Sequence, residues 1–345
     1  MSHHLLMHSW RTARVAVAAL ALTAAALTVS GSASTGGLSA TAPVAASAAA
    51  GTPCLTGGSA QRVRADSGLA GVDPNDLTVG QTEQAESQLA QRTSQRRLSA
   101  SSVPTKVTID VYVHVIKRSS GSGGVSKSRI KKQISVLNAA YAGKSSSSST
   151  KTIFGFKLKK TDSVKKSDWY HWSVDNVGDD DDVKAKTKLH RGGFDDLNLY
   201  LADLEDPTAP EGQQEVLGYS TFPWDTTLAE DGVVVLNRSL PGGSDQGYNK
   251  GDTAVHEVGH WLGLLHTFEN GCDEPGDAVA DTPNQADGLN IFSCDAVDTC
   301  PSTGKDPVHN FMSYGDDACL NRFTAGQADR MVRAWQAFRS PTSAG

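Results

Sequence analysis

Residues Thr253 to Phe268 read T-A-V-H-E-V-G-H-W-L-G-L-L-H-T-F. It contains the pattern H-E-x-x-H-x-x-G-x-x-H. His256 and His260 are four residues apart, so on a helix they lie one turn apart on the same face and can bind one ion. Gly263 stands where a left-handed residue would end the helix, a conformation that glycine adopts most easily. We therefore predict that His266 turns back as a third ligand of the same ion.

The three imidazoles predict a catalytic zinc site. Neutral imidazole suits zinc, and three protein ligands leave a fourth position open for water. Glu257, next to the first ligand, is predicted to take a proton from that zinc-bound water as general base, without binding the metal. The alternative is an amphipathic core helix, because several apolar residues of the stretch would bury well. The added glycine and third histidine favour zinc, since this combination is rare at ordinary residue frequencies.

Length and charge limit the function classes. A chain of 345 residues can hold one large domain or two smaller ones with full cores. Charged residues make up 20% of the chain and the net charge is -6. Neither nucleic acid nor an anionic membrane surface is therefore an expected partner. No feature of the sequence indicates an oligomeric state.

The first 33 residues are typical of a secretory signal peptide. Arg11 and Arg14 precede an apolar run from Val15 to Val29, and small residues follow. The run is shorter than the about 20 residues that a membrane-spanning helix needs. We expect a secreted, extracellular protein with no stable membrane insertion after signal removal, and an anchored form is the alternative.

Residues 34–97 are expected to form a propeptide that is largely unstructured alone. The segment is rich in Ala, Ser, Thr, Gly and Gln and too poor in apolar residues to bury a core. Arg96 and Arg97 are a predicted processing site in an exposed loop, and order is expected from about Val103. The lone Cys54 is predicted either to bind the zinc and keep the enzyme latent, or to be a spare or intermolecular thiol.

The remaining region, 98–345, is predicted to be an α+β metalloprotease catalytic domain. Its upper subdomain, to about residue 266, combines a twisted mixed sheet with two long helices. Its lower subdomain, 267–345, is irregular, carries disulfides and ends in a helix.

Periodicity places the elements of this region. Amphipathic runs predict a helix at 126–141, capped by Ser126 or Ser128, and a helix at 324–339, capped by Thr324. Alternating or apolar runs predict strands at 107–115, 154–160, 170–174, 197–204, 217–222 and 232–237. The acidic run from Asp179 to Asp182 is interpreted as a solvated loop rather than a calcium site.

The cysteines after the zinc motif predict covalent cross-links. Cys272, Cys294, Cys300 and Cys319 are an even set in an exported chain, which predicts two disulfides with three possible connectivities. A structural zinc site made by all four is the alternative, although the set contains no C-x-x-C pair.

Two more stretches carry candidate site residues. Residues 276–283 offer carboxylates, a hydroxyl and carbonyls that suit calcium, or else form an Asx-rich turn. Met312 is predicted to form a soft apolar floor beneath the ligand imidazoles, and the alternative is ordinary core packing. Tyr314 is predicted to donate a hydrogen bond to the oxyanion of a tetrahedral intermediate.

Together these motifs resemble the pappalysin family of metzincins, and among them the small secreted microbial enzymes of the ulilysin and cytophagalysin type. The long histidine pattern with a later methionine turn is the metzincin signature. The resemblance is densest over residues 230–340 and fades through the rest of the catalytic region. It rests on the stretches 240–244, 256–263, 276–283, 310–314 and 323–331.

The resemblance implies zinc endopeptidase activity on peptide or protein substrates, a cleft between the two subdomains, and synthesis as a zymogen. It assigns the zinc to His256, His260 and His266, the base to Glu257, the turn methionine to Met312 and the oxyanion contact to Tyr314.

Further features follow from the resemblance alone. It implies calcium binding by Asp277, the Val279 carbonyl and Thr282. It implies disulfides that join Cys272 to Cys300 and Cys294 to Cys319. A cysteine switch in related proenzymes makes Cys54 the candidate, although the glycine expected after such a cysteine is replaced by Leu55. Asp316 or Asp317 is a candidate acid for selecting a basic residue after the scissile bond.

Two other functions stay open at this point. One is an exported zinc hydrolase that acts on non-protein amides, such as a cell-wall amide. The other is a catalytically silent binding protein on the same scaffold, which the intact Glu257 and the three histidines argue against.

Overall fold

The computed structural model describes residues 59–63, 76–97, 104–172, 180–204, 216–286 and 288–341. The predicted signal peptide and Cys54 lie outside these residues. Among the helices of the described residues, none combines the length and the apolar character that a membrane crossing requires.

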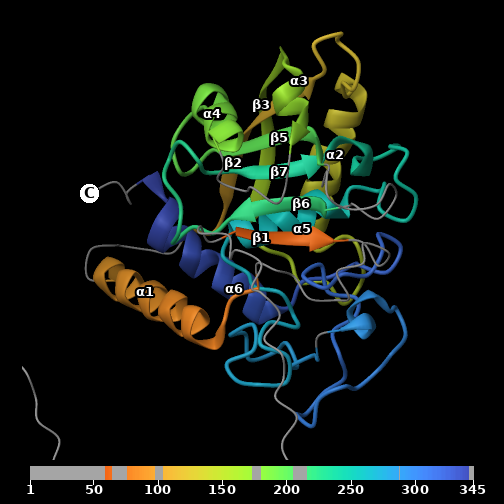
Figure 1. Ribbon diagram of the computed structural model, residues 1–345. Helices are drawn as coiled ribbons and strands as arrows, with labels where there is room; N and C mark the ends of the chain where they lie inside the picture. The colour runs from red at the N-terminus through yellow and green to blue at the C-terminus, as the bar shows by residue number, and fades with distance from the viewer. Residues whose placement is uncertain are drawn as a thin grey trace, which may run out of the picture. The chain divides into compact units, whose positions relative to one another are not determined.

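A seven-stranded mixed sheet forms the upper part of the fold, in the order β1-β6-β7-β5-β2-β3 with β4 beside β5 (Figure 1). Strands β2, β3, β4, β5 and β7 pair in parallel, β6 is antiparallel to β7, and β1 is antiparallel to β6. The strands are β1 (Ser59–Val63), β2 (Val107–Lys117), β3 (Phe154–Lys165), β4 (His171–Trp172), β5 (Leu197–Leu204), β6 (Val216–Thr221) and β7 (Val233–Leu236). The mixed sheet confirms the predicted α+β architecture.

Helices α2 and α5 pack against the sheet and enclose the main apolar core, to which both helices and the central strands contribute. The helices are α1 (Val79–Arg97), α2 (Lys127–Tyr141), α3 (Ser167–Tyr170), α4 (Asp180–Leu189), α5 (Asp252–Trp261) and α6 (Ala325–Ala334). Three shorter helical segments are η1 (Asn237–Ser239), η2 (Leu289–Phe292) and the π-helical η3 (Trp335–Arg339). After α5 the chain is mostly irregular until α6, as predicted for the lower subdomain.

Both predicted helix caps are present. The hydroxyl of Ser126 accepts from the backbone N–H of Arg129 at the start of α2. Thr324 and Gln327 form a reciprocal capping box at the start of α6. Each cap satisfies backbone donors that the helix itself leaves without a partner.

Order begins earlier than the predicted Val103, because β1 and α1 precede it. Residues 59–63 and 76–97 have too little apolar surface to form a core of their own, and they pack against the rest of the fold. Leu89 of α1 packs with Ala334, Ala337 and Phe338 near the C-terminal end. Arg96 and Arg97 end α1, so they do not lie in the exposed loop that the processing-site prediction assumed.

The acidic run also differs from its predicted loop, since Asp180 begins α4. Asp182 is buried, pairs with Lys186 at 3.2 Å one helical turn later, and accepts from the hydroxyl of Tyr219 at 2.8 Å. Acidic residues are favoured in the first turn of a helix by its dipole. The predicted strand at 170–174 begins one residue later, as β4, because α3 ends at Tyr170. Residues 173 and 174 lie outside the described residues.

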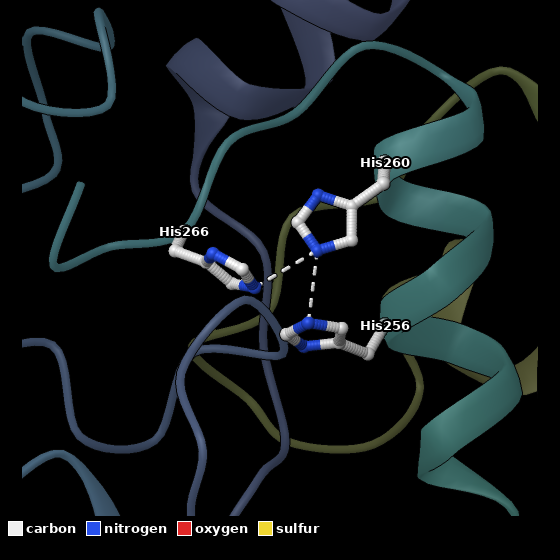
Figure 2. Close-up of side chains that lie close together, drawn as sticks. All are labelled: His256, His260 and His266. Atoms are coloured by element: carbon white, nitrogen blue, oxygen red, sulfur yellow. Dashed lines mark hydrogen bonds between the residues drawn. The ribbon is translucent and has the colours of Figure 1, made fainter. Parts of the chain in front are cut away.

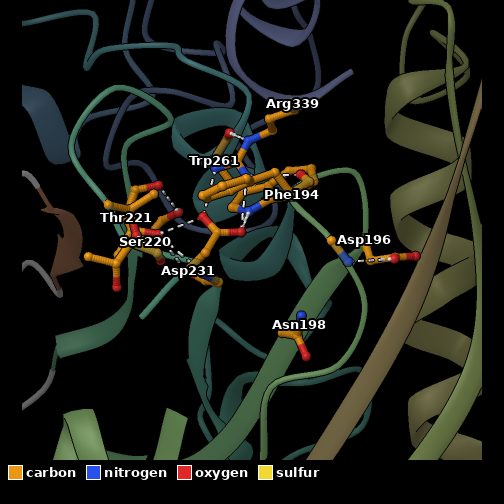
Figure 3. Close-up of polar contacts among 12 residues, drawn as sticks. Phe194, Asp196, Asn198, Ser220, Thr221, Asp231, Trp261 and Arg339 are labelled. Carbon is orange, nitrogen blue, oxygen red and sulfur yellow. Dashed lines mark hydrogen bonds and ion pairs between the residues drawn. The ribbon is translucent and has the colours of Figure 1, made fainter. Parts of the chain in front are cut away.

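A buried polar network fixes the end of α5 (Figure 3). The guanidinium of Arg339 donates to both carboxylate oxygens of Asp231, each at 3.0 Å, and to the carbonyl of Trp261 at 2.6 Å. The indole N–H of Trp261 donates to Asp231 at 2.9 Å. The network joins η3 to the C-terminal end of α5, where the chain turns toward the third histidine.

Candidate active site

Helix α5 and the loop after it bring the three histidines together (Figure 2). The Nε2 atom of His260 lies 2.9 Å from Nε2 of His256 and 3.1 Å from Nε2 of His266. All three side chains are fully buried. A tetrahedral zinc ion with Zn–N bonds of about 2.0–2.1 Å needs ligand nitrogens about 3.3–3.4 Å apart. The three donors therefore fit zinc after movements of a few tenths of an ångström.

The outer nitrogens hold the rings in this orientation. His256 Nδ1 donates to the Phe311 carbonyl at 2.7 Å, and His260 Nδ1 donates to the Leu264 carbonyl at 2.9 Å. A proton on Nδ1 leaves the lone pair of Nε2 directed at the shared centre. Backbone carbonyls thus select the tautomer that a metal ligand requires.

Carboxylates hold the third ring. His266 Nδ1 lies 3.0 Å from a carboxylate oxygen of Asp76 and 3.7 Å from one of Glu269. Carboxylates beside the outer nitrogen of a histidine ligand orient the ring and raise its basicity. Sequence reasoning missed both acids, because neither belongs to the histidine motif.

Burial lowers the pKa of His256 and of His260 well below the usual value for histidine, and the neighbouring imidazoles lower both further. Both rings are therefore neutral at neutral pH. Neutral imidazole is the form that binds zinc.

Gly263 makes the turn that returns His266 to the centre. Its φ of 92° is in the left-handed region, and a β-carbon there would lie 2.7 Å from the β-carbon of Ala334. Its carbonyl accepts from the Arg330 guanidinium at 2.7 Å. The position therefore requires glycine both for its conformation and for the close approach of α6.

Glu257 is fully buried on α5 and faces strand β6. A β-carbon at Gly218 would lie 2.9 Å from Glu257 Cγ and 3.1 Å from its Oε1. A glycine in the strand thus makes room for the predicted base. In the sequence, this feature is visible only as a glycine inside a predicted strand. Such a glycine indicates that another part of the chain approaches the strand closely.

Met312 lies against α5, and Tyr314 lies beside the imidazoles. The sulfur of Met312 lies so close to α5 that a β-carbon at Gly259 would collide with it. The ring of Tyr314 packs against the rings of His256 and His266, with centroids 5.7 and 5.0 Å apart. Both side chains are fully buried.

The lower subdomain contains the two disulfides that the resemblance implied. Cys272 is joined to Cys300, and Cys294 is joined to Cys319. All four cysteines are used in this way, so the alternative of a four-cysteine zinc site is wrong.

The predicted calcium ligands also come together. Asp277 and Thr282 are buried, and Asp277 Oδ1 accepts from the backbone N–H of Val279 at 3.0 Å. Burial raises the pKa of Asp277 to about 8. Among the described residues, neither Asp277 Oδ2 nor Thr282 Oγ1 has a hydrogen-bond partner.

The two candidate acids of the substrate pocket differ in their surroundings. Asp316 accepts from the backbone N–H groups of Ala318 and Cys319 and so closes a turn. Asp317 is buried, and one of its oxygens accepts from the N–H groups of Lys250 and Gly251 at the start of α5.

The other oxygen of Asp317 binds a residue that sequence reasoning missed. Arg62 of β1 pairs with Asp317 Oδ1 at 3.1 Å, and neither side chain is exposed. Because the two residues are 255 positions apart, no local pattern could have joined them.

Several known proteins are similar to this chain in sequence and in fold. Residues 183–336 match the family model described as Pregnancy-associated plasma protein-A. An extracellular metalloprotease of Arthroderma gypseum is 39% identical over 249 residues, which cover 70% of this chain and 76% of the relative. One from Sordaria macrospora is 41% identical over 252 residues, which cover 70% of this chain and 79% of the relative. A solved structure of a promirolysin mutant from Tannerella forsythia has a TM-score of 0.57 at 25% identity, over 75% of this chain and 92% of that one.

The similarity covers more than two thirds of the chain and of each of these relatives. The family model spans α5 with its histidines and the turn with Met312. The fold and the site geometry agree with the assignment, because three buried imidazoles meet at one centre and a buried carboxylate adjoins the first of them in the sequence. The chain therefore belongs to the pappalysin family, the family of Pregnancy-associated plasma protein-A, and is a metalloendopeptidase.

Proposed function

We propose that the chain is a secreted, zinc-dependent endopeptidase that is made as a zymogen. The observation that carries the proposal is the convergence of the Nε2 atoms of His256, His260 and His266 next to Glu257. The site lies beside strand β6, where an extended peptide can be held by its main chain. The extracellular relatives and the signal-like first 33 residues support secretion.

Zinc bound by the three imidazoles would supply Lewis acidity and lower the pKa of a water molecule. Glu257 takes the proton of the water that attacks the scissile carbonyl and later returns it to the leaving amine. Tyr314 donates a hydrogen bond to the oxyanion of the tetrahedral intermediate. Glu257 is buried against β6, where Gly218 leaves room for its carboxylate.

Asp317 is the acid that we assign to the selection of a basic substrate side chain. The backbone amides of Lys250 and Gly251, just before α5, hold one carboxylate oxygen, and the other binds the guanidinium of Arg62. A carboxylate fixed in this way is preorganised for a charged hydrogen bond. Asp316 is less suited, because it closes its own turn.

A calcium ion at Asp277, the carbonyl of Val279 and Thr282 is part of the proposal. Buried oxygens without hydrogen-bond partners are costly unless a cation binds them. Carboxylate, carbonyl and hydroxyl oxygens are the ligands that calcium prefers. The ion would fix the loop that follows the third histidine.

We propose that the segment before residue 98 is removed on activation, and that Cys54 contributes a thiolate to latency. Peptides and proteins are the proposed substrates, in line with the peptidase family.

The function is tested with the processed protein on a casein and a peptide panel. Glu257→Ala should retain one zinc per chain and lose at least about a hundredfold in kcat/KM, because general-base catalysis contributes about 10²–10⁴-fold. Residual activity within about tenfold of wild type would show that another group is the base. Zinc content with no turnover of proteins by the wild type would favour a silent binding protein, and turnover of a cell-wall amide alone would favour the other hydrolase.

A further inference from the structure

Phe222, the first residue after β6, lies beside the histidine centre. Gly218 of β6 faces Glu257, and successive side chains of a strand alternate between its two faces. Phe222 follows four residues later and therefore shares the face of Gly218. Its ring meets the ring of His260 edge-on, with the two centroids 5.6 Å apart. The face of β6 that carries the proposed base thus ends in an aromatic side chain at the second histidine.

Phe222 forms an apolar cluster with Leu265 and Trp224. The indole of Trp224 stacks on the ring of Phe222, with the centroids 4.7 Å apart and the planes nearly parallel. A β-carbon at Gly263 would lie 3.4 Å from this indole, so Trp224 lies against the turn between the second and third histidines. Phe222 and Leu265 are buried, whereas Trp224 is half-buried. The apolar cluster is therefore a wall at one end of the site.

The apolar cluster and Asp317 lie at opposite ends of α5. Asp317 accepts from two backbone N–H groups just before the helix begins. Phe222 contacts His260, which is in the last turn of the helix. Glu257 lies between these two positions in the helix. A substrate that extends along α5 therefore meets an acid at one end of the site and an apolar wall at the other.

Strand β1 shows the register of a strand that is added to β6 (Figure 1). The two strands are antiparallel, Arg62 is opposite Gly218, and the pairing is regular from Ser59 to Arg62. The guanidinium of Arg62 binds Asp317. Directly opposed residues of antiparallel strands direct their side chains to the same face. A substrate strand in this register, with a basic residue at Asp317, therefore has the fourth residue before it opposite Phe222.

An apolar side chain covers the apolar cluster in the full chain. Leu77, just before α1, packs against the buried pair of Phe222 and Leu265. It belongs to the segment before residue 98, whose removal on activation is part of the proposed function. Apolar surface that loses its cover is stabilised by about 25 cal/mol per Å² when another apolar group buries it again. The mature enzyme therefore offers this surface to an apolar side chain of the substrate.

We propose that Phe222, Trp224 and Leu265 form a substrate subsite that selects an apolar side chain four residues before the basic residue held by Asp317. This inference rests on the proposed function and names the substrate class of the same site. The substrates are extended segments with an apolar residue and, four positions later, a basic residue directly after the scissile bond. The aromatic rings favour such segments because they remove apolar surface from water.

Cleavage of matched peptides tests the subsite. The full chain is allowed to mature, and kcat/KM is measured for two peptides that carry arginine after the scissile bond and either leucine or serine four residues before that arginine. The leucine peptide should have the higher kcat/KM by about tenfold or more, because even one methylene group in an apolar pocket is worth about 10–200-fold. The same exchange three residues before the arginine should change kcat/KM less than about threefold, since that side chain points to the opposite face of the strand.

Substitutions assign the preference to the apolar cluster. Trp224→Ala should lower the ratio of kcat/KM between the leucine and serine peptides to about threefold or less, and Trp224→Phe should keep most of the ratio because an aromatic ring remains. The ratio does not depend on the amount of active enzyme, so partial misfolding of a variant does not affect it. The matched control is Leu228→Ala, which shortens an exposed apolar side chain in the same loop and should leave the ratio unchanged.

The possible results separate the subsite from the proposed function. Equal kcat/KM for the leucine and serine peptides would overturn the subsite, and so would a preference for leucine that Trp224→Ala leaves intact. Cleavage of casein but of neither peptide would also overturn it. No cleavage of casein or of either peptide by the mature chain would refute the proposed function, and the subsite with it.

Discussion

Gly218→Ala is the substitution that tests the placement of the base most sharply. The added β-carbon would lie 2.9 Å from Glu257 Cγ, where carbon atoms ordinarily approach to about 3.5 Å. It cannot retreat, because the carbonyl oxygen of Val234 lies 2.9 Å away from it. Glu257 must therefore shift by about 0.6 Å or more relative to the histidines.

The loss of activity in Gly218→Ala can be worked out from this shift of Glu257. Misplacement of a catalytic group by about 1 Å can lower the rate about a hundredfold, so we expect a loss of about tenfold to a hundredfold in kcat/KM. This corresponds to about 1.4–2.7 kcal/mol of transition-state stabilisation. The assay is cleavage of a fluorogenic peptide by the processed enzyme, with zinc content measured in the same sample.

The matched control is Gly155→Ala, a glycine in β3 whose added β-carbon would have its nearest neighbour at 3.5 Å, an ordinary contact. It should leave activity within about twofold of wild type, the range expected for a change that strains nothing. Wild-type activity in Gly218→Ala, with zinc bound and the fold intact, would refute the placement of Glu257 beside β6.

Two other predictions concern stability. Arg339→Ala leaves the carboxylate of Asp231 buried without its guanidinium and should lower the free energy of unfolding by about 3–5 kcal/mol in a denaturant titration; a loss below about 1 kcal/mol would contradict the role of the network. Because burial raises the pKa of Asp277 from 3.8 to about 8, the unfolded chain releases this proton at lower pH than the folded protein. The calcium-free protein should therefore lose stability as pH rises through this window in thermal unfolding scans. Calcium or Asp277→Asn should remove that loss, and an unchanged pH profile with calcium would argue against the site.

Local signals predicted much of the fold. The buried strand β5 begins and ends at its predicted residues, and Ser126 and Thr324 cap their helices. These features depend on residues close together in the sequence, such as a cap and its partner three residues later. The histidine motif is of the same kind, because one helical turn and one glycine determine its geometry.

Features that depend on distant residues could not be predicted. Strand β1 and helix α1 have too little apolar surface to fold alone and are stabilised by β6 and by the C-terminal helices. The pair between Arg62 and Asp317 and the pair between Arg339 and Asp231 join residues more than a hundred positions apart. The role of Gly218 becomes evident only when the structure places Glu257 opposite it.

Zinc X-ray absorption on the processed protein can show whether the three histidines bind one zinc ion. Three imidazole nitrogens from His256, His260 and His266 should appear at about 2.0–2.1 Å, with the remaining position filled by a light atom. Replacement of any one of the three histidines by alanine should lower zinc content and abolish cleavage together. A first shell with fewer than three imidazoles, or a protein that cuts peptides equally well without zinc, would contradict the account.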